Sequence, residues 1–279
     1  MENMKVAAVQ MNSLVGAVAQ NLQSLAGWVA KAAAEEVDLI CFPEMSISGY
    51  AMPQSTASSE SLVDEAVAQV LEMSAEYAVT IAAGISERAE GQHYLTHFIA
   101  EEGRLVGSYR KTHLGEREKV CYTAGDSIEV INCRKARIGI QLCWESHFPE
   151  ISSILALKGA DVILMPHASG LPAARRKEVW DKCLRARAYD NSVYVVACNQ
   201  LDDNGLGTVF GGGCVIIDPR GNVLAEDYAG KASILTAELT SDQLDKLRQK
   251  EYQSMKDLYY LNRRRPELYG VLTKREIVD

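Results

Sequence analysis

Short apolar runs alternate with longer segments of helical spacing over most of the chain, and this alternation restricts the possible folds more than any other feature. The apolar runs predict strands at 5–11, 38–44, 79–86, 93–100, 104–113, 136–143, 161–168, 192–200, 211–219 and 222–228. The helical spacing predicts helices over 21–34, 62–77, 150–158 and 175–191, followed by a last helix from Ser241. This order is typical of a layered α/β protein.

Short turns separate two neighbouring pairs of these strands and indicate antiparallel pairing. The sequence EEG joins one pair at 101–103, and PRGN joins the other at 219–222. Parallel strands need longer crossover connections, so mixed sheets are expected, and a mixed-sheet sandwich fits better than a doubly wound parallel fold. No linker, composition shift or repeat divides the chain. We therefore expect one domain over 1–279, with 241–279 as a C-terminal helix and tail.

The composition argues against several classes of protein. The net charge of −8 opposes binding to nucleic acid, and basic runs such as RRR at 263–265 are short. No segment approaches the roughly 20 apolar residues that cross a bilayer, and the N-terminus lacks a signal-peptide pattern. Seven cysteines without CxxC spacing indicate reduced thiols and a cytoplasmic protein. The five histidines are scattered, so neither a metal nor another cofactor is expected.

Three chemically active side chains stand near the ends of expected strands. They are Glu44 in DLICFPE, Lys111 in GSYRKTHL and Cys143 in GIQLCWES. Catalytic groups in α/β folds gather at such ends. Taken singly, the glutamate and the lysine could be solvated loop residues, and the cysteine could be a buried, inert one. Together they match a single mechanism: a thiol nucleophile, a carboxylate that accepts its proton, and a cation that stabilises an oxyanion.

A cysteine–histidine pair is an alternative for activating the thiol. His147 lies four residues after Cys143, in an expected loop or helix start. A local pair of the kind that papain-like hydrolases use is therefore possible. The same histidine could also be a partly exposed loop residue or part of a pocket wall.

Seven ordered blocks extend over nearly the whole chain and together resemble the carbon–nitrogen hydrolase, or nitrilase, superfamily, in its amidase or carbamoylase-like branch. The blocks are VAAVQMN, DLICFPEMSISGY, YRKTHLGEREKVCYTAGD, CWESHFPE, GADVILMPHASG, RARAYDNSVYVVACNQ and GGGCVIIDPRGNVLAE. This resemblance implies a four-layer α-β-β-α sandwich with mixed β-sheets, in agreement with the strand pattern.

The resemblance also implies roles for individual residues. Glu44 matches the general base, Lys111 the cationic catalytic residue, and Cys143 the nucleophile. The Lys111 ammonium and the backbone N–H of Trp144 match the donors of the oxyanion hole. An unperturbed cysteine is only a few per cent thiolate at neutral pH, so such assistance is needed.

A second glutamate of the family matches Glu118 rather than Glu116, because of its spacing to the segment YTAG. Glu118 is expected to orient Lys111 or the substrate; alternatively it is a surface acid in a charged run. The chain departs from the family pattern at Ala124, where proline is common, and at Cys121, where an aromatic residue is common. Cys214 stands where relatives often have serine and is expected to be a strand residue.

The expected reaction is hydrolysis of a non-peptide C–N bond in a small amide or N-carbamoyl compound, through a thioester on Cys143 that releases ammonia or an amine. The sequence HFPE after Glu145 favours this branch, and 279 residues is short for a nitrilase. The CWE sequence itself resembles true nitrilases, so hydrolysis of a small nitrile is the alternative. Acyl transfer and a non-catalytic binding subunit also stay open.

The substrate pocket is expected near the segment CWESHFPE and two other strand ends. Glu145 would suit a substrate amine and His167 a polar or anionic group, although each could equally be a structural contact. The candidate substrate-binding residues are Tyr50, Trp144, Glu145, His147, His167 and Ala168, with Ser169 beside them. A homodimer or higher homo-oligomer is expected from the resemblance, with the tail 259–279 as a possible arm between subunits or packed on its own.

Overall fold

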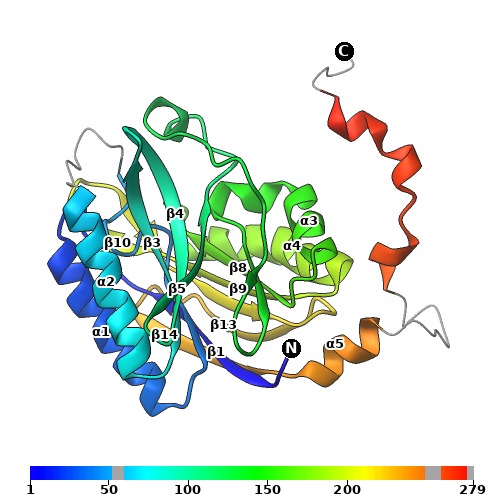
Figure 1. The fold of residues 1–279 in the computed structure, drawn as a ribbon, viewed down its shortest axis with the longest axis horizontal. Helices are drawn as coiled ribbons and strands as arrows, with labels where there is room; N and C mark the ends of the chain where they lie inside the picture. The colour runs from blue at the N-terminus through cyan, green and yellow to red at the C-terminus, as the bar shows by residue number, and fades with distance from the viewer. Residues whose placement is uncertain (52–59, 249–258, 275–279) are drawn as a thin grey trace.

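The computed structural model describes residues 1–51, 60–248 and 259–274, and it is built around two six-stranded mixed sheets (Figure 1). The first sheet has the order β14-β1-β2-β3-β4-β5. Its strands are β1 (Met4–Gln10), β2 (Leu39–Cys41), β3 (Thr80–Ala89), β4 (Gln92–Glu101), β5 (Arg104–Arg110) and β14 (Ser233–Leu239). Strands β1, β2 and β3 run parallel, and the outer strands are antiparallel to their neighbours.

The second sheet has the order β13-β12-β9-β8-β7-β6. Its strands are β6 (Ile131–Asn132), β7 (Arg137–Ile140), β8 (Val162–His167), β9 (Tyr194–Asn199), β12 (Cys214–Ile217) and β13 (Val223–Asp227). Strands β7, β8 and β9 are parallel, and the remaining pairings are antiparallel. A separate antiparallel pair consists of β10 (Leu201–Asp203) and β11 (Val209–Gly211).

Helices cover the outer face of each sheet. The helices α1 (Val18–Ala34) and α2 (Glu60–Glu76) pack on the first sheet, and α3 (Pro149–Leu157) and α4 (Ala173–Asn191) pack on the second. The helix α5 (Ser241–Arg248) follows β14. Short 3₁₀ turns are η2 (Glu118–Val120), η3 (Cys143–His147), η5 (Tyr260–Arg263), η6 (Pro266–Leu268) and η7 (Gly270–Thr273). The expected four-layer α-β-β-α sandwich is therefore confirmed.

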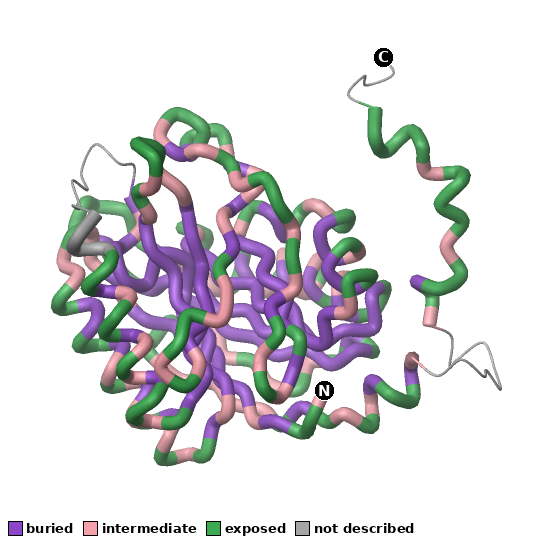
Figure 2. Tube along the Cα trace, in the orientation of Figure 1, coloured by how far each residue is buried: buried purple, intermediate pink, exposed green. Residues whose placement is uncertain are grey.

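The central strands are apolar on both faces because each face meets a different layer. In β1, Val6 and Ala8 point to the opposite sheet, while Ala7 and Val9 point to the helices. Side chains alternate across a strand with a period of two, so burial on both sides produces a continuous apolar run. Figure 2 shows the buried strands between partly exposed helices. This packing explains why the central strands were readable from the sequence.

Strand β14 was not predicted, although it pairs with β1 along its whole length, from Met4 opposite Leu239 to Gln10 opposite Ser233. Most of its residues are only half-buried, since it lies at the edge of the sheet, and its apolar run is correspondingly weak. The prediction also missed the short strands β6, β10 and β11 and the β3–β4 hairpin. Glu90 and Gly91 turn that hairpin, both with positive φ, as a tight hairpin turn requires.

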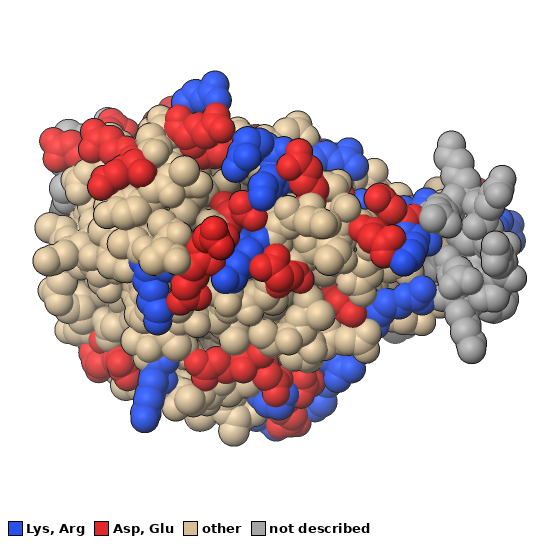
Figure 3. Space-filling model, turned by 90° about the horizontal axis from the view of Figure 1, so that it is seen from below, with Lys and Arg blue, Asp and Glu red and all other residues tan. Residues whose placement is uncertain are grey.

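The charged side chains are spread over the surface. Figure 3 shows acidic and basic groups interspersed on the face seen from below. Among the described residues, no helix is both long enough and apolar enough to span a membrane.

Candidate active site

A buried lysine lies between two carboxylates. Lys111 follows β5, its side chain is 0% exposed, and its Nζ donates to Glu44 Oε1 at 2.9 Å and to Glu118 Oε1 at 2.7 Å. The two negative charges raise the pKa of Lys111 against the opposing effect of burial. The lysine therefore stays an ammonium throughout the neutral range. A buried ammonium needs such partners, because an unpaired charge in the interior is strongly unfavourable.

Glu44 follows β2 and connects the two sheets. Its Oε2 accepts a hydrogen bond from the Ala168 N–H at 3.1 Å, and its main-chain carbonyl accepts one from Gln200 Nε2 at 2.7 Å. Burial raises the pKa of Glu44 from its ordinary 4.5 to about 7, although Lys111 lowers it. A carboxylate with a pKa near 7 is well suited to accept and return a proton at neutral pH.

Glu118, on η2, completes the group around the lysine. Tyr50 donates its hydroxyl to Glu118 Oε1 at 2.7 Å, and the Gly115 N–H donates to Glu118 Oε2 at 2.6 Å. Glu116 instead lies on the surface, with its side chain 87% exposed and paired with Lys119. The structure thus brings Glu118, rather than Glu116, to the lysine.

Cys143 begins η3 shortly after the end of β7, in a backbone conformation that residues other than glycine rarely adopt. Its φ is +23°, in a region that is unfavourable for residues other than glycine. Burial, together with the negative charge of Glu44, raises the pKa of the thiol to about 12, although Lys111 and Arg176 act to lower it. In the resting site the thiol is protonated, close to a carboxylate that can take its proton.

Trp144 and His147 lie outward of the cysteine. The Trp144 side chain is 47% exposed and its ring packs edge-on against His147, with the centroids 5.2 Å apart. Within the described residues, neither ring nitrogen of His147 bonds to Cys143 and the Trp144 N–H has no acceptor. The local cysteine–histidine pair does not form here, and the Trp144 N–H is available to a ligand.

Of the two interpretations of Glu145, a substrate contact or a structural contact, its protein partners favour the structural one. Its carboxylate is fully buried and accepts hydrogen bonds from the Tyr109 hydroxyl at 2.7 Å and from the Thr112 and Leu142 N–H groups at 2.8 Å each. Further donors are the Thr112 hydroxyl and the His113 N–H. Since protein donors occupy both oxygens, Glu145 holds the lysine segment against the cysteine turn.

The protein partners of His167 likewise favour a structural contact over the alternative of substrate binding. Its Nδ1 lies 2.8 Å from the Met165 carbonyl, and its Nε2 accepts a hydrogen bond from Trp180 Nε1 at 3.2 Å. Burial lowers the pKa of His167, so the ring is neutral. It is a buried structural histidine beneath the site. Its neighbour Ala168 reaches the site through its N–H to Glu44, and Ser169 bonds to Asn199.

Arg176 is a residue near the cysteine that the sequence reading missed. It lies in the first turn of α4 and is 4% exposed. A signal was present in the helical spacing, because Arg176, Trp180, Leu184 and Ala188 are four residues apart and all buried. A lone arginine in an otherwise apolar helical stripe is rarely buried without a function or a partner.

A cavity of about 380 Å³ adjoins this group. Tyr50 and Ala168, which contact Glu118 and Glu44, form part of its wall, and Arg117 is the charged member of the described lining. The other residues that line it are Ala51, Gly170, Asn204, Leu206, Thr208 and Phe210. The space fits a small organic molecule, at the lower end of the usual range for ligand pockets.

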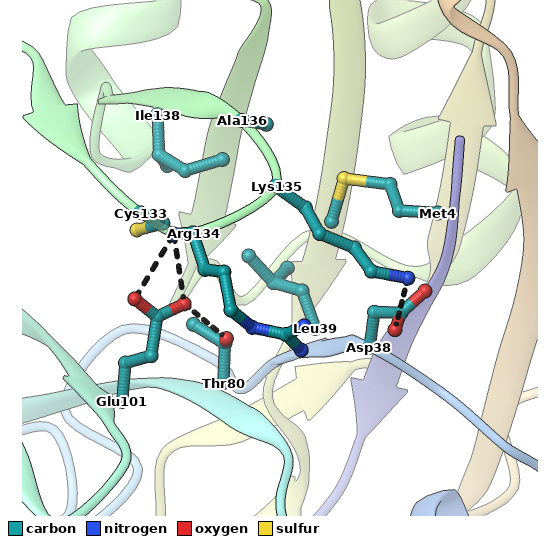
Figure 4. Close-up of a pocket in the computed structure, with 10 residues that line it drawn as sticks. All are labelled: Met4, Asp38, Leu39, Thr80, Glu101, Cys133, Arg134, Lys135, Ala136 and Ile138. Carbon is teal, nitrogen blue, oxygen red and sulfur yellow. Dashed lines mark hydrogen bonds and ion pairs between the residues drawn. The ribbon is translucent and has the colours of Figure 1, made fainter. Parts of the chain in front are cut away.

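A second cavity lies between the sheets at the opposite ends of the strands and is too small for a substrate, with a volume of about 10 Å³ (Figure 4). Its charged groups are already paired: Lys135 Nζ contacts Asp38 Oδ1 at 2.7 Å, and Glu101 accepts from the Arg134 N–H at 3.0 Å. No three metal-ligand side chains cluster within the described residues. The chemistry is therefore concentrated around Lys111.

A thiol, two carboxylates and an ammonium at the meeting edges of two sheets are the groups that a cofactor-independent thiol hydrolase requires. Comparison with known proteins identifies the family. The carbon-nitrogen hydrolase family model matches residues 5–249. The chain therefore belongs to the carbon–nitrogen hydrolase family, as the resemblance of its sequence blocks predicted, and it is an enzyme that hydrolyses carbon–nitrogen bonds.

Individual relatives agree with this assignment. A probable nitrilase of Schizosaccharomyces pombe is 29% identical over 95% of this chain and 96% of its own length. An (R)-stereoselective amidase of a Pseudomonas species is 30% identical, with 91% of each chain covered. The fold matches the solved structure of an amidase from Nesterenkonia sp. AN1 with a TM-score of 0.84, at 23% identity over 97% of each chain.

Proposed function

We propose that the chain hydrolyses a small amide or N-carbamoyl compound through a thioester on Cys143. The observation that carries this proposal is the contact of Lys111 Nζ with both Glu44 and Glu118, next to a cysteine that shares their electrostatic environment. A surface or structural role would not require a fully buried ammonium beside a thiol. Amide cleavage needs these three functions together: a nucleophile, a proton acceptor and a stabilised oxyanion.

In the first half of the reaction Glu44 accepts the thiol proton while the sulfur attacks the carbonyl carbon. The two steps occur together because a thiol whose pKa is raised to about 12 leaves little free thiolate. The C–S bond forms and the carbonyl oxygen becomes an oxyanion, held by the Lys111 ammonium and the Trp144 N–H. Collapse of this intermediate breaks the C–N bond, and Glu44 returns its proton to the leaving nitrogen, which departs as ammonia or an amine.

In the second half a water molecule attacks the thioester carbonyl and gives a proton to Glu44. The C–S bond breaks, the acid product leaves, and the cysteine sulfur recovers the proton from Glu44. Lys111 keeps its proton throughout. Glu118 balances the lysine charge and, with the Tyr50 hydroxyl on its Oε1, fixes the ammonium in place. Glu118 thereby acts as a positioning residue.

The substrate is proposed to occupy the cavity beside Tyr50 and Ala168. The relative named as an amidase supports an amide, and the relative named as a nitrilase supports a nitrile as the second candidate. Ammonia release over a matched panel of amides, carbamoyl amines and nitriles distinguishes them, with the Cys143→Ala variant as the blank. Amide or carbamoyl turnover well above nitrile turnover is expected, and the reverse order would assign a nitrilase.

Acyl transfer and simple binding make different predictions for the same site. Mass spectrometry of the protein with an amide substrate is expected to detect an acyl adduct on Cys143. A binding subunit would give no adduct. A transferase would pass the acyl group to an added amine more rapidly than to water, so competition with hydroxylamine separates transfer from hydrolysis.

We also propose that the chain pairs with a second copy of itself. The groove between α3 and the segment 259–274 is lined by the exposed side chains of Leu157, at 50%, and Leu272, at 64%, with Ile154 and Tyr269 beside them. Figure 1 shows this segment, in orange to red, projecting beyond the body of the sandwich. Exposed apolar side chains gathered in one groove are typical of an interface. Light scattering is expected to give a dimeric mass, reduced by Leu157→Glu; a monomeric wild type would contradict pairing.

A cytoplasmic location is proposed from the state of the thiols. All seven cysteines are free, and the sulfur atoms of Cys41 and Cys198 lie 3.8 Å apart in the core without a bond between them. Reduced thiols are the rule in the cytosol. Fractionation of cells that express the tagged protein tests this location.

A further inference from the structure

The cavity of about 380 Å³ beside the active site has an apolar inner wall. Ala51, Ala168 and Phe210 belong to its lining and are buried. The rings of Tyr50 and Phe210 meet edge-on, with their centroids 6.2 Å apart and an angle of 87° between the ring planes. Two aromatic rings and two methyl groups therefore form the surface that a ligand meets inside the cavity.

The polar groups of this wall are bonded within the protein or exposed to water. Asn204 is buried, its Oδ1 accepts from the Leu206 and Thr208 N–H groups at 2.9 and 3.1 Å, and its Nδ2 donates to the Tyr50 carbonyl at 2.9 Å. The Tyr50 hydroxyl donates to a carboxylate of the active site. The other polar side chains of the described lining, Arg117 and Thr208, are exposed. A polar group that entered the cavity would lose its hydration without gaining a partner, whereas an apolar group would not.

The outer wall of the cavity is the hairpin of β10 and β11, and hydrogen bonds hold the tip of this hairpin in place. Asp203 Oδ1 accepts from the N–H groups of Gly205 and Gly207 at 2.7 and 3.3 Å. Both glycines have positive φ, at 85° and 80°, which a tight turn of this kind requires. The Asn204 carbonyl accepts from the Val15 N–H at 2.9 Å, so the tip is attached to the loop after β1. This wall therefore needs no ligand to form, and its side chains determine what the cavity admits.

Leu206 lies at the tip of the hairpin, where the cavity opens to solvent. It belongs to the cavity lining, yet it is 57% exposed. Val209, on the same hairpin, is 61% exposed and is absent from the described lining. Side chains alternate along a strand, so Val209 points away from the face on which Phe210 reaches the cavity. A large apolar side chain at the mouth of a cavity loses its contact with water when an apolar ligand covers it.

The cavity begins at the two carboxylates that bind the catalytic lysine. The Ala168 N–H donates to Glu44 Oε2 at 3.1 Å, and the Tyr50 hydroxyl donates to Glu118 Oε1 at 2.7 Å. Both wall residues are thus in direct contact with the reacting centre. From there the open space extends between Tyr50 and Ala168 to Leu206 at the mouth.

We propose that this cavity binds an apolar group of the substrate and that Leu206 covers the end of that group. The natural substrate is then an amide or N-carbamoyl compound with an alkyl or aryl group beside the bond to be cleaved. This inference rests on the proposed hydrolysis at Cys143. The apolar group lies against the rings of Tyr50 and Phe210 and reaches Leu206 at the mouth. It belongs either to the acyl part or to the leaving amine, and substrates of both kinds distinguish the two.

The first experiment measures how kcat/KM depends on alkyl length in two substrate series. One consists of straight-chain primary amides, and the other of N-carbamoyl alkylamines of matched length. We expect kcat/KM in one series to rise about 4-fold with each added methylene group until Leu206 is covered, since burial of a methylene group contributes about 0.8 kcal/mol. A rise among the amides assigns the apolar group to the acyl part, and a rise among the carbamoyl compounds assigns it to the amine. No rise in either series overturns the proposal.

Matched substitutions on the hairpin separate Leu206 from the hairpin as a whole. Leu206→Asp places a charge at the mouth and is expected to lower the ratio of kcat/KM between the longest and the shortest substrate about 10- to 100-fold. Leu206→Ala, which adds no charge, is expected to lower the ratio less. Val209→Asp makes the same change at an exposed residue outside the lining and is expected to keep the wild-type ratio. The thermal midpoint reports the folding of each variant. An unchanged ratio in both Leu206 variants, or an equal fall in Val209→Asp, overturns the proposal.

The second experiment does not need turnover. N-methyl, N-butyl and N-hexyl iodoacetamide alkylate Cys143, and mass spectrometry measures each rate relative to the reaction of the same reagent with glutathione. The wild type and Val209→Asp are expected to react faster with the longer reagents, whereas Leu206→Asp reacts at similar rates with all three. Similar rates in the wild type overturn the apolar subsite. Length-dependent alkylation without turnover of any amide or carbamoyl compound would retain the subsite and refute the proposed function. Turnover without a length dependence in either experiment would do the opposite.

Discussion

The Glu145 carboxylate accepts a hydrogen bond from the Thr112 N–H at 2.8 Å, and through this contact the residue after Lys111 is attached to the turn that carries Cys143. The other carboxylate oxygen accepts from the Leu142 N–H, just before the cysteine. One buried acid therefore fixes the distance between the ammonium and the sulfur. This bracing role explains why the Glu145 carboxylate is fully buried although it does not contact the reacting groups.

Glu145→Gln is expected to reduce both stability and kcat. An amide nitrogen at this position would face N–H donors, leaving at least one of them unsatisfied, which costs about 1–3 kcal/mol of unfolding free energy. Urea denaturation measures the loss, and kinetics with a saturating amide measures kcat. Glu150→Gln, at an exposed position on α3, is the control and should change neither. A Glu145→Gln protein as stable and active as wild type would show that the hydrogen bonds of this carboxylate are not needed.

Cys143→Ala is expected to abolish hydrolysis while the protein stays folded, because the variant lacks the nucleophile. Removal of a nucleophile typically lowers kcat by about 10³-fold or more. Ammonia release measures the activity, and the thermal midpoint reports the fold. Cys133→Ala, which removes a thiol from the far end of the sandwich, should keep activity. Undiminished turnover in Cys143→Ala would refute the thioester.

Glu118→Gln is expected to lower kcat about 10- to 100-fold, because Lys111 loses one of its two counter-charges and the oxyanion donor is less well held. The matched change Glu116→Gln, two residues earlier on the surface, should leave kcat unchanged. Steady-state kinetics on one amide decides. Equal effects of the two substitutions would show that Glu118 has no role in the active site.

The pH dependence of kcat/KM is expected to rise with a midpoint near 7. Glu44 must be ionised to accept the thiol proton, and burial raises its pKa from 4.5 to about 7. Activity is therefore lost as the pH falls through 7. The pKa of Lys111 is raised, so the lysine produces no falling limb in the mildly alkaline range. An ascending limb centred near 4.5, the value of an unperturbed glutamate, would contradict the buried setting of Glu44.

The same shift has a consequence for stability. A carboxyl whose pKa is higher in the folded than in the unfolded chain favours folding most when it is protonated in both states. Its contribution is therefore largest below pH 4.5 and decreases as the pH rises from 4.5 to about 7. Glu44→Gln should remove this part of the pH dependence, which denaturation at pH 5 and pH 8 would show.

The sequence alone was sufficient to predict those strands whose burial produces a run of apolar residues. Strands such as β8 are buried throughout because both faces are covered. Glu44 and Cys143 come shortly after the largely buried strands β2 and β7, whereas Lys111 directly follows the more exposed edge strand β5. The edge strand β14 leaves no such pattern. Its pairing with β1 joins residues more than two hundred positions apart, which no local window contains.

The sequence was least informative about polar residues that are buried for structural reasons. Glu145 and His167 were candidates for either substrate binding or a structural contact, because polar residues at strand ends can serve both, and only the folded structure reveals their protein partners. Arg176 was missed for the converse reason, since a basic residue in a helix rich in charge resembles a surface residue. Its distinguishing property is that the buried Nε and Nη2 have no hydrogen-bond acceptor among the described residues, which is a property of the fold.

Glu44 and Lys111 follow strands of one sheet, whereas Cys143 and Ala168 follow strands of the other. The site therefore exists only after the two sheets have docked. In a folding intermediate with only one sheet formed, Cys143 would be an ordinary, slowly reacting thiol. The chain therefore becomes catalytically active only in the last step of folding. The rate at which activity returns during refolding would therefore measure when the two sheets dock. Circular dichroism, which reports the formation of secondary structure, would not resolve this step.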